Sequence, residues 1–277
     1  MIKRFRQLFR ATGAPDPVAA QGPAAAAVPA GTRVYAVGDI HGRIDLFSAL
    51  VDAIEADDAA AVVRDGPAET TVVLLGDLID RGPDSAGVLG LAREWRNHRR
   101  VRILCGNHEE MLLQSFDNIE VLRHFLRHGG RETVLSFGID EPTYVEATFE
   151  EVQAMMHQAV PQAALDFIAS FEDVVRIGDY AFVHAGVRPG VPLAEQRTGD
   201  LRWIRESFLG SGNAHEAVIV HGHTITEGIE LRPNRIGIDT GAYLSGVLTA
   251  LCLEGPHRRL IEARAGEDGI TIHHTAI

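Results

Sequence analysis

The sequence predicts an α/β fold built around a largely parallel β-sheet, and three observations support this prediction. Three short runs rich in β-branched residues lie at 33–37, 70–75 and 101–105. Each is directly followed by Gly-Asp or Gly-Asn. Apolar residues at helical spacing lie between them, at 44–54 and 88–95. Strands that alternate with helices are typical of βαβ units, whose strands are parallel. The 277 residues, 45% of them hydrophobic and 23% charged, also suffice for a globular chain with a substantial core.

The chain changes character after the third of these strands. Residues 109–171 have mostly helical patterns, which predict an inserted segment that could form one wall of a pocket. Strand patterns return after Asp173, and we find no internal repeat. The predicted strands of this second half lie at 174–178, 180–186, 217–223, 234–241, 246–253, 257–264 and 270–274. We therefore expect one catalytic domain from residue 31 to residue 277.

The first thirty residues differ from this pattern. Residues 1–10 carry four basic side chains among apolar residues at helical spacing, and residues 11–31 are mostly Ala, Pro and Gly with one charge. These compositions predict a disordered basic start and an Ala/Pro-rich linker over residues 1–30. The alternative is a short basic amphipathic helix at 1–10 that contacts an anionic membrane surface, or a partner, weakly.

The charge balance narrows the classes of function. Lys and Arg number 26 and Asp and Glu number 38, which gives a formal net charge of −12. Binding of nucleic acid over a broad face requires basic residues that neutralise phosphates, so we expect no nucleic-acid partner. The two cysteines, Cys105 and Cys252, cannot form a disulfide framework, which favours a cytoplasmic protein. The amphipathic alternative at 1–10 would add a peripheral position on the inner face of the membrane.

Five short motifs carry the candidate functional residues. They are GDIHG at 38–42, GDLIDRG at 76–82, GNHE at 106–109, HAG at 184–186 and HGH at 221–223. Four of them begin at the end of a predicted strand, and the histidine of HAG closes a strand. Because α/β proteins place their chemistry in loops at the carboxyl ends of strands, we expect these residues to meet at one edge of a sheet.

The motifs supply carboxylate, imidazole and amide ligands without a thiolate. This mixture suits Mn²⁺, Fe²⁺ or Zn²⁺ and differs from the cysteine ligands of structural zinc. Six ligands exceed the needs of one catalytic ion and fit two ions about 3.5–4 Å apart that share a carboxylate. Such a pair catalyses in-line displacement at phosphorus, because it holds both the nucleophile and the phosphoryl oxygens. The candidate ligands are Asp39, His41, Asp77, Asn107, His184 and His223.

Three further residues of these motifs suit phosphoryl transfer. His108 directly follows a candidate ligand and could protonate the leaving oxygen, a role typically worth about 10²–10⁴-fold. Asp80 could orient His108 and stabilise its protonated form. Arg81 offers a planar guanidinium for two phosphate oxygens. Any one Gly-Asp, HAG or HGH is more often a turn or a packed histidine, but five such motifs at strand ends favour a functional site.

Together, the five motifs resemble those of the PPP family of metal-dependent serine/threonine phosphatases. The likeness is strongest to the bacterial and bacteriophage branch, which is related to symmetrical diadenosine tetraphosphate hydrolases. It extends from residue 33 to about residue 253 and includes the segments LRWIR at 201–205 and IDTGA at 238–242. The resemblance implies a metallophosphoesterase αββα sandwich, in which two mixed sheets lie face to face with helices outside and a helical insert at about 109–171.

The resemblance also implies a role for each motif residue. Phosphate would be bound by Arg81, Asn107 and Arg205. His108 would be the general acid, with Asp80 as the partner that orients it. Two cation sites are implied, and Asp77 bridges them. The first consists of Asp39, His41 and Asp77. The second consists of Asp77, Asn107, His184 and His223.

Three other positions have a rival or depart from the family pattern. Arg205 matches a W-x-R pattern at 203–205, and Arg202 is its rival within the same segment. His221 stands where relatives often carry an aromatic or aliphatic residue, and we expect it to pack in its strand or to support a ligand. Cys105 takes a position that is often basic in the family, where a thiol adds no positive potential.

The implied reaction is hydrolysis of phosphomonoesters by direct attack of a hydroxide that bridges the two cations, with His108 as general acid. A protein phosphorylated on serine or threonine is the preferred substrate, and Mn²⁺ is the expected metal, with Fe²⁺ and Zn²⁺ as alternatives. A symmetrical dinucleoside polyphosphate hydrolase, or another small-molecule phosphoesterase, is the first alternative function. A non-catalytic binding module that holds metal is the alternative of another class. Such a module usually lacks the acid pair and the phosphate arginines, which are present here.

Overall fold

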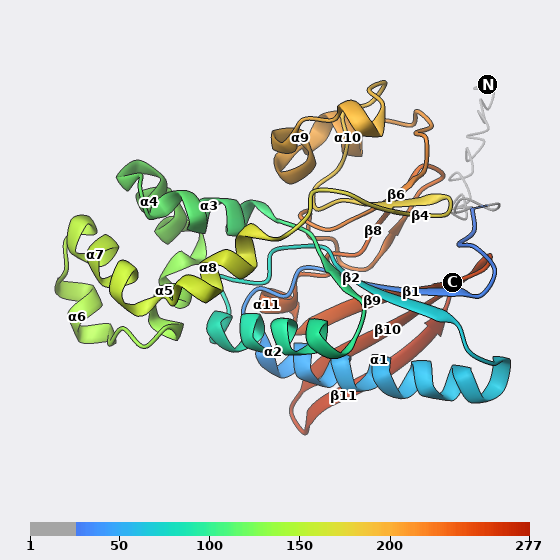
Figure 1. Cartoon of the computed structure of the whole chain (residues 1–277), viewed down its shortest axis with the longest axis horizontal. Coiled ribbons are helices and arrows are strands. Elements are labelled where there is room, and N and C mark those ends of the chain that lie inside the picture. Colours follow the sequence, from blue (N-terminus) through green and yellow to red (C-terminus); the bar gives the residue numbers. More distant parts are fainter. Residues whose placement is uncertain (1–25) are drawn as a thin grey trace, which may run out of the picture.

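The computed structural model describes residues 26–277, which form two β-sheets packed face to face with helices outside (Figure 1). The first sheet has six strands in the order β11-β10-β9-β1-β2-β3. Strands β1, β2 and β3 are parallel, whereas β9, β10 and β11 are antiparallel. The strands of this sheet are β1 (Thr32–Val37), β2 (Glu69–Leu74), β3 (Val101–Ile103), β9 (Val247–Glu254), β10 (His257–Gly266) and β11 (Gly269–Ala276).

The second sheet has five strands in the order β4-β5-β6-β8-β7 and is also mixed. Strands β5, β6 and β8 are parallel, and the edge strands β4 and β7 are antiparallel to their neighbours. The strands of this sheet are β4 (Val175–Ile177), β5 (Tyr180–Phe182), β6 (Val218–His221), β7 (Glu230–Leu231) and β8 (Arg235–Gly237). The αββα arrangement of two mixed sheets is thereby confirmed. The expectation of a largely parallel sheet is wrong for β9–β11, because turns of about two residues join these strands and permit only antiparallel pairing.

Alternate residues of β1 contribute to two different cores, because successive side chains of a strand point to opposite faces. Val34 and Ala36 face the second sheet and pack in a core with Phe182 of β5. Tyr35 and Val37 point the other way, into the core formed with helices α1 (Ile44–Asp65) and α2 (Ser85–His98). A strand that is buried on both faces is mostly apolar, which is why residues 34–37 do not alternate with charged residues.

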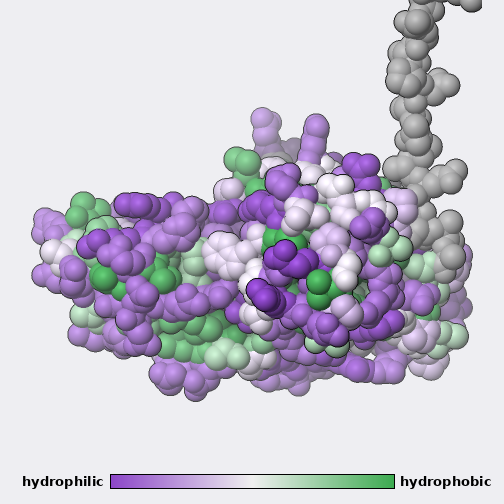
Figure 2. Space-filling model, turned by 90° about the horizontal axis from the view of Figure 1, so that it is seen from above, coloured by the Kyte–Doolittle hydropathy of each residue, from purple (hydrophilic) through white to green (hydrophobic). Residues whose placement is uncertain are grey.

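Helices α9 (Thr198–Trp203) and α10 (Glu206–Leu209) cover the outer face of the second sheet (Figure 1). Leu201 and Phe208 of these helices pack against Ala181 and Ile219 in a third core. Figure 2 shows the molecule from this side, and hydrophilic residues cover most of the surface. Within residues 26–277, no helix combines the length and the apolar character needed to cross a bilayer.

The predicted helical insert is confirmed, and it projects from one end of the sandwich (Figure 1). Its buried side chains, among them Met111, Leu122 and Phe167, continue the core that α1 and α2 form with the first sheet. Gly129 has a φ of +106°, and its backbone interrupts the helical path inside a short π-helical segment. The elements of the insert are α3 (Asn107–Ser115), α4 (Ile119–Phe125), the π-helix Leu126–Gly130, α5 (Arg131–Ser136), α6 (Glu141–Glu146), α7 (Phe149–Ala159) and α8 (Gln162–Ala169).

The packed part of the chain begins earlier than residue 31. Val28 is buried between the sheets and donates its N–H to the carbonyl of Gly255 at 3.1 Å. Tyr180 donates its hydroxyl to the carbonyl of Ala26 at 3.1 Å. The end of the predicted linker is therefore part of the fold, which its Ala/Pro-rich composition concealed. The predicted basic helix at 1–10 and the rest of the linker lie outside the described residues.

A buried ion-pair network ties α1 to the central strands β9, β1 and β2 of the first sheet. The guanidinium of Arg33 is fully buried and donates to Asp58 of α1 at 2.7 Å and to Glu254 of β9 at 2.5 Å. Asp58 also accepts hydrogen bonds from Arg99 and Thr70, each at 2.8 Å. Because Arg33 has no contact with water, the carboxylates of Asp58 and Glu254 compensate its positive charge.

Candidate metal centre and phosphate site

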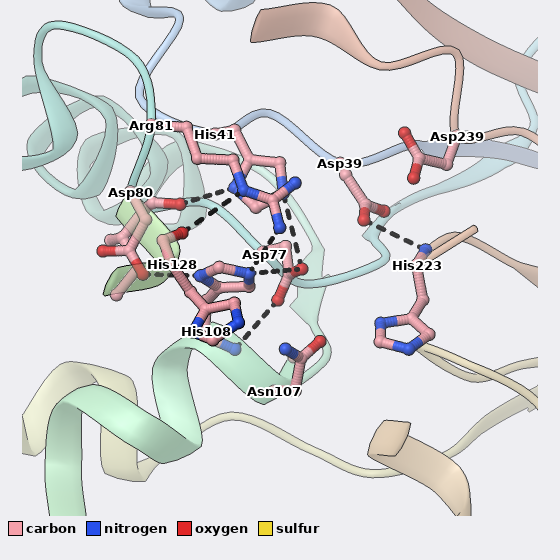
Figure 3. A network of polar contacts seen from close by, with 12 residues as sticks. Asp39, His41, Asp77, Asp80, Arg81, Asn107, His108, His128, His223 and Asp239 are labelled. Carbon is pink, nitrogen blue, oxygen red and sulfur yellow. Dashed lines mark hydrogen bonds and ion pairs between the residues drawn. The ribbon is translucent and has the colours of Figure 1, made fainter. Parts of the chain in front are cut away.

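The five motifs lie at the carboxyl ends of β1, β2, β3, β5 and β6. Figure 3 shows how residues of the first three motifs and His223 of the last lie together. The glycines of the motifs permit close approaches: an added Cβ on Gly222 would lie 2.0 Å from Asp39 Oδ1. The six candidate ligands are all buried. The structure therefore brings together Asp39, His41, Asp77, Asn107, His184 and His223, as the sequence predicts.

Asp77 occupies the middle of this cluster. Its Oδ2 lies 3.5 Å from His41 Nε2, and its Oδ1 lies 3.4 Å from His184 Nε2. Two groups of side chains could each hold a cation, and both contain Asp77: His41, Asp77 and His108 form one, and Asp77, His184 and His223 form the other. This shared position is the geometry that a bridging carboxylate requires.

Backbone carbonyls fix the orientation of two of the histidines. His41 Nδ1 lies 2.7 Å from the carbonyl of Ile79, and His184 Nδ1 lies 2.8 Å from the carbonyl of Leu75. Each Nδ1 must carry a proton to make its bond, so each Nε2 presents a lone pair to Asp77. Ligating imidazoles in metalloproteins are typically oriented in this way.

Nitrogen and oxygen atoms that could bind a cation converge in this cluster. His184 Nε2 lies 3.0 Å from Asn107 Oδ1 and 3.2 Å from His223 Nδ1. Asp39 Oδ1 and His223 Nε2 are buried and have no hydrogen-bond partner. Buried polar atoms are rarely left without a partner, since the loss of water costs about 1–3 kcal/mol each. Oxygen and nitrogen ligands in this arrangement fit divalent cations.

Burial sets the protonation of the cluster. It lowers the pKa of His41 to about 3 and that of His223 to about 2, and it also lowers the pKa of His184. Burial alone would raise the pKa of Asp77, but the positive charges of His184, His108 and His41 outweigh this effect and hold it below its usual range. At neutral pH Asp77 is therefore anionic and the imidazoles of His41, His184 and His223 are neutral, the state in which these groups bind a cation.

The backbone of the site is strained. Among residues 26–277, five residues other than glycine have a positive φ, and such residues cost about 1–3 kcal/mol each. All five lie in the predicted site, where the surrounding packing holds them. They are His41 (47°), Asp77 (49°), Asp80 (72°), Arg81 (69°) and His223 (62°).

The predicted acid pair is in direct contact. His108 Nδ1 lies 2.5 Å from Oδ2 of Asp80, which is fully buried. Thr133 of the insert donates its hydroxyl to Asp80 Oδ1 at 2.5 Å, and the N–H of Asp80 donates to Thr133 and to Ser85, each at 2.9 Å. Burial would lower the pKa of His108, but the charges of Asp77 and Asp80 outweigh it and raise the pKa above its usual range. The sequence analysis did not find Thr133 or Ser85, because no motif surrounds either residue.

Glu109 is another residue that the sequence analysis left without a role, although it ends the GNHE motif. Its buried carboxylate accepts the backbone N–H groups of Asp77 at 2.9 Å, Leu78 at 2.8 Å and Gly106 at 2.8 Å. Burial, followed by the charge of Asp77, raises the pKa of Glu109 to about 7. Glu109 thus ties the loop after β2 to the start of α3 and fixes the backbone of Asp77.

Arg81 lies between the acid pair and the insert. Its Nη2 lies 3.0 Å from His108 Nε2, and its guanidinium stacks on the ring of Tyr243 at 4.7 Å. Its backbone N–H donates to the carbonyl of Gly129 at 3.0 Å, and its Nε donates to that of His128 at 3.4 Å. A protonated His108 cannot accept a bond from Arg81, and the guanidinium then has donors for an anion.

The arrangement of the two rival arginines favours Arg205. Arg202 is held by Asp173, with nitrogen–oxygen distances of 2.8 and 2.7 Å. Arg205 is exposed, and its Nη1 lies 3.5 Å from the hydroxyl of Thr224, the residue after the ligand candidate His223. Its charge acts on His184 and His223, so it lies at the edge of the cluster where a phosphate could reach it.

The two remaining positions lie outside the cluster of candidate ligands. His221 Nδ1 lies 3.1 Å from the carbonyl of Gly222, and its Nε2 lies 3.2 Å from Arg235 Nη1, which agrees with packing in its strand. Cys105 is buried, and burial raises the pKa of its thiol. A thiol that keeps its proton is a poor ligand for a cation.

A sandwich of two mixed sheets with aspartates, histidines and an asparagine buried at the shared edge defines a metal-dependent phosphoesterase. The chain belongs to the calcineurin-like phosphoesterase family, whose sequence pattern matches residues 32–240.

Individual relatives differ in the substrates that their names state. The chain is 25% identical to a symmetrical bis(5'-nucleosyl)-tetraphosphatase of Nitrosospira multiformis, over 87% of this chain and 98% of that protein. It is 31% identical to serine/threonine-protein phosphatase 1 of Salmonella typhimurium, over 78% of this chain and 90% of that protein. A crystal structure assigned provisionally to a diadenosine tetraphosphatase has the same fold, with a TM-score of 0.56 and 20% identity over 91% of this chain and 98% of that chain.

Proposed function

We propose that this phosphoesterase hydrolyses phosphomonoesters of serine and threonine in proteins. The observation that carries the proposal is the buried His108–Asp80 pair, with Arg81 in contact with it, directly beside the Asp77 cluster. A proton donor, a guanidinium and a cation-binding cluster within one site are what displacement at a phosphomonoester requires. The relative from Salmonella typhimurium, which is named as a serine/threonine-protein phosphatase, supports the choice of a protein substrate.

Asp39, His41 and Asp77 would hold one divalent cation, and Asp77, Asn107, His184 and His223 the other. When bound, the two cations supply positive charge at the phosphoryl oxygens and lower the pKa of a water molecule toward neutrality. The ligand chemistry suits Mn²⁺ best, with Fe²⁺ and Zn²⁺ as alternatives.

The chain's own residues orient the phosphate and neutralise its charge. Arg81 and Arg205 approach the cluster from opposite sides, since one contacts His108 and the other lies beside His223. Their guanidinium groups stabilise the charge that spreads over the equatorial oxygens in the transition state. Asn107, whose Oδ1 faces His184, has an amide nitrogen left to donate to the substrate.

The acid pair supplies the proton for the leaving group. Asp80 accepts a hydrogen bond from Nδ1 of His108. This bond keeps the other ring nitrogen, Nε2, directed toward Asp77 and Arg81. The proton on Nε2 passes to the departing oxygen of the serine or threonine, which is a poor leaving group without it.

Hydrolysis of symmetrical dinucleoside polyphosphates is the second candidate. The relative from Nitrosospira multiformis bears that name and aligns over 98% of its own length. Arg127 of the insert is exposed and directly precedes His128, whose carbonyl binds Arg81, so added positive charge lies near the phosphate site. Such charge suits a substrate with several phosphates.

One experiment separates the two candidates. The metal-stripped protein is reloaded with Mn²⁺ and given a phosphothreonine peptide and diadenosine tetraphosphate at matched concentrations. We expect a higher kcat/KM for the peptide, and a higher value for the dinucleotide would favour the second candidate. Asp39→Asn, which removes a proposed ligand, is the inactive control. If neither substrate is hydrolysed with Mn²⁺, Fe²⁺ or Zn²⁺, the binding-module alternative replaces both.

A matched pair of variants tests the basic residues of the insert. Arg127→Ala should lower kcat/KM for the dinucleotide several-fold and leave the peptide unchanged if the second candidate is correct. Arg64→Ala removes an equally exposed arginine at the end of α1, where it pairs with Asp65, and should change neither.

A further inference from the structure

Asp239 lies at the same edge of the sandwich as the candidate ligands, two residues beyond the end of β8. The backbones of β1 and β8 approach closely there, because an added Cβ on Gly38 would lie 2.5 Å from the carbonyl oxygen of Ile238. The residues that directly follow these two positions are Asp39 and Asp239. Their carboxylates face each other across the gap (Figure 3).

The two carboxylates are close enough to share a hydrogen bond, and the donors recorded for each come from the backbone. Asp239 is 2% exposed, and its Oδ1 accepts the N–H of Gly241 at 2.9 Å. Asp39 is also 2% exposed, and its Oδ2 accepts the N–H of His223 at 3.0 Å, while its Oδ1 has no partner. Two buried carboxylates in contact, one of them with an oxygen that no other residue binds, require either a shared proton or a cation beside them.

The charged side chains near the two carboxylates do not fill the gap between them. Arg81 acts on both carboxylates, yet its guanidinium is engaged with His108 and Tyr243. The donors recorded for Asp39 and Asp239 are otherwise the backbone N–H groups of His223 and Gly241.

We propose that Asp239 is a residue of the metal centre, whose charge beside Asp39 increases the affinity of the site for the cation that Asp39 would hold. This proposal rests on the proposed cation site, and it adds a third carboxylate to the side that Asp39 and His41 form. Asp239 acts through its charge and by holding Asp39 in place, and it is a positioning residue for the reaction.

The rival explanation is purely structural. Asp239 could serve only to accept the N–H of Gly241 and so stabilise the turn that leads into α11 (Ala242–Ser245). Under that explanation its charge has no bearing on cation binding, and an asparagine, which retains the acceptor oxygen, should replace it without effect.

The test is the cation affinity of Asp239→Asn, measured by competition with a chromophoric chelator for Mn²⁺ and independent of turnover. We expect binding that is weaker by about 10–100-fold, as is typical when a group that supports a metal ligand is removed. Without metal, the variant should unfold at the same temperature as the original protein or higher, because repulsion among the carboxylates is relieved. The rise in unfolding temperature on addition of Mn²⁺ should shrink.

Asp58→Asn is the matched control, since it also removes a buried aspartate charge but lies in the network of Arg33. It should lower stability and leave the cation affinity unchanged. An Asp239→Asn protein that binds Mn²⁺ as tightly as the original overturns the proposal, whether or not its metal-free form is less stable. If the original protein binds Mn²⁺ but hydrolyses no phosphoester, the proposed function fails. The assignment of Asp239 is still decided by the Mn²⁺ affinity of Asp239→Asn.

Discussion

Asp80→Asn should slow hydrolysis of esters with poor leaving groups and spare those with good ones. The side chain keeps its size, so the contact with His108 Nδ1 at 2.5 Å is preserved in shape but loses its charge. A buried hydrogen bond to a charged group is worth about 1.5–3 kcal/mol, which corresponds to a loss of about 10–150-fold in kcat. Esters that leave as stable anions need little proton donation, so p-nitrophenyl phosphate should change by less than about threefold.

The assay compares kcat for p-nitrophenyl phosphate and for an alkyl phosphate at pH 7, with the cation content of each protein measured in parallel. His108→Asn gives the reference loss, and the double variant should be no slower than His108→Asn alone, because the two residues act as one unit. Equal losses on both substrates would refute the reasoning. A loss of bound cation in Asp80→Asn would also refute the reasoning, because Asp80 would then support the metal ligands rather than His108.

Three further outcomes follow from the structure. Asp58→Asn should lower the free energy of unfolding by about 3 kcal/mol in urea titrations, because Arg33 keeps only Glu254 as a charged partner. Burial would raise the pKa of Asp58, but hydrogen bonds from Arg33, Thr70 and Arg99 hold it below its usual range. The stabilisation is therefore complete above the unfolded-state pKa of about 3.9 and is lost as pH falls through the lower folded pKa, a dependence that the variant should lack. Gly222→Ala should abolish cation binding in the chelator assay while secondary structure is retained, because the added methyl meets Asp39. Arg205→Ala should raise KM without loss of cation, whereas Arg202→Ala should chiefly lower the unfolding temperature, because Arg202 is paired with Asp173.

The candidate ligands could be predicted because the chain marks each of them locally. Asp39, Asp77 and Asn107 each follow a glycine at the end of an apolar strand, and the topology of α/β sheets brings such positions to one edge. The helical insert was predictable for a similar reason, since its helices show the periodicity of buried faces.

The residues that support these ligands could not be found in this way. Thr133 reaches Asp80 across 53 positions of sequence, and only the fold of the insert brings the two together. Asp239 follows a strand just as Asp39 does, but no histidine or second carboxylate close in sequence distinguishes it from a turn. The burial of Val28 also depends on tertiary contacts, because residues 26–31 are too few to show a hydrophobic periodicity. The antiparallel pairing of β9–β11 depends on short turns that the strand pattern alone does not reveal.

The contact between Arg81 and Gly129 has a consequence for how this enzyme can diversify. An added Cβ on Gly129 would lie 2.5 Å from Arg81 Cγ, and the carbonyl of the same residue binds the Arg81 backbone. Thr133 also donates a hydrogen bond to Asp80. The segment 129–133 therefore holds two residues of the candidate site in place, in addition to covering them. Exposed positions such as Arg127 can vary to suit new substrates, whereas exchange of the whole insert for that of a relative would remove the contacts that Thr133 makes with Asp80 and Gly129 makes with Arg81. Substrate range in this chain should therefore change by single exposed residues rather than by exchange of whole modules.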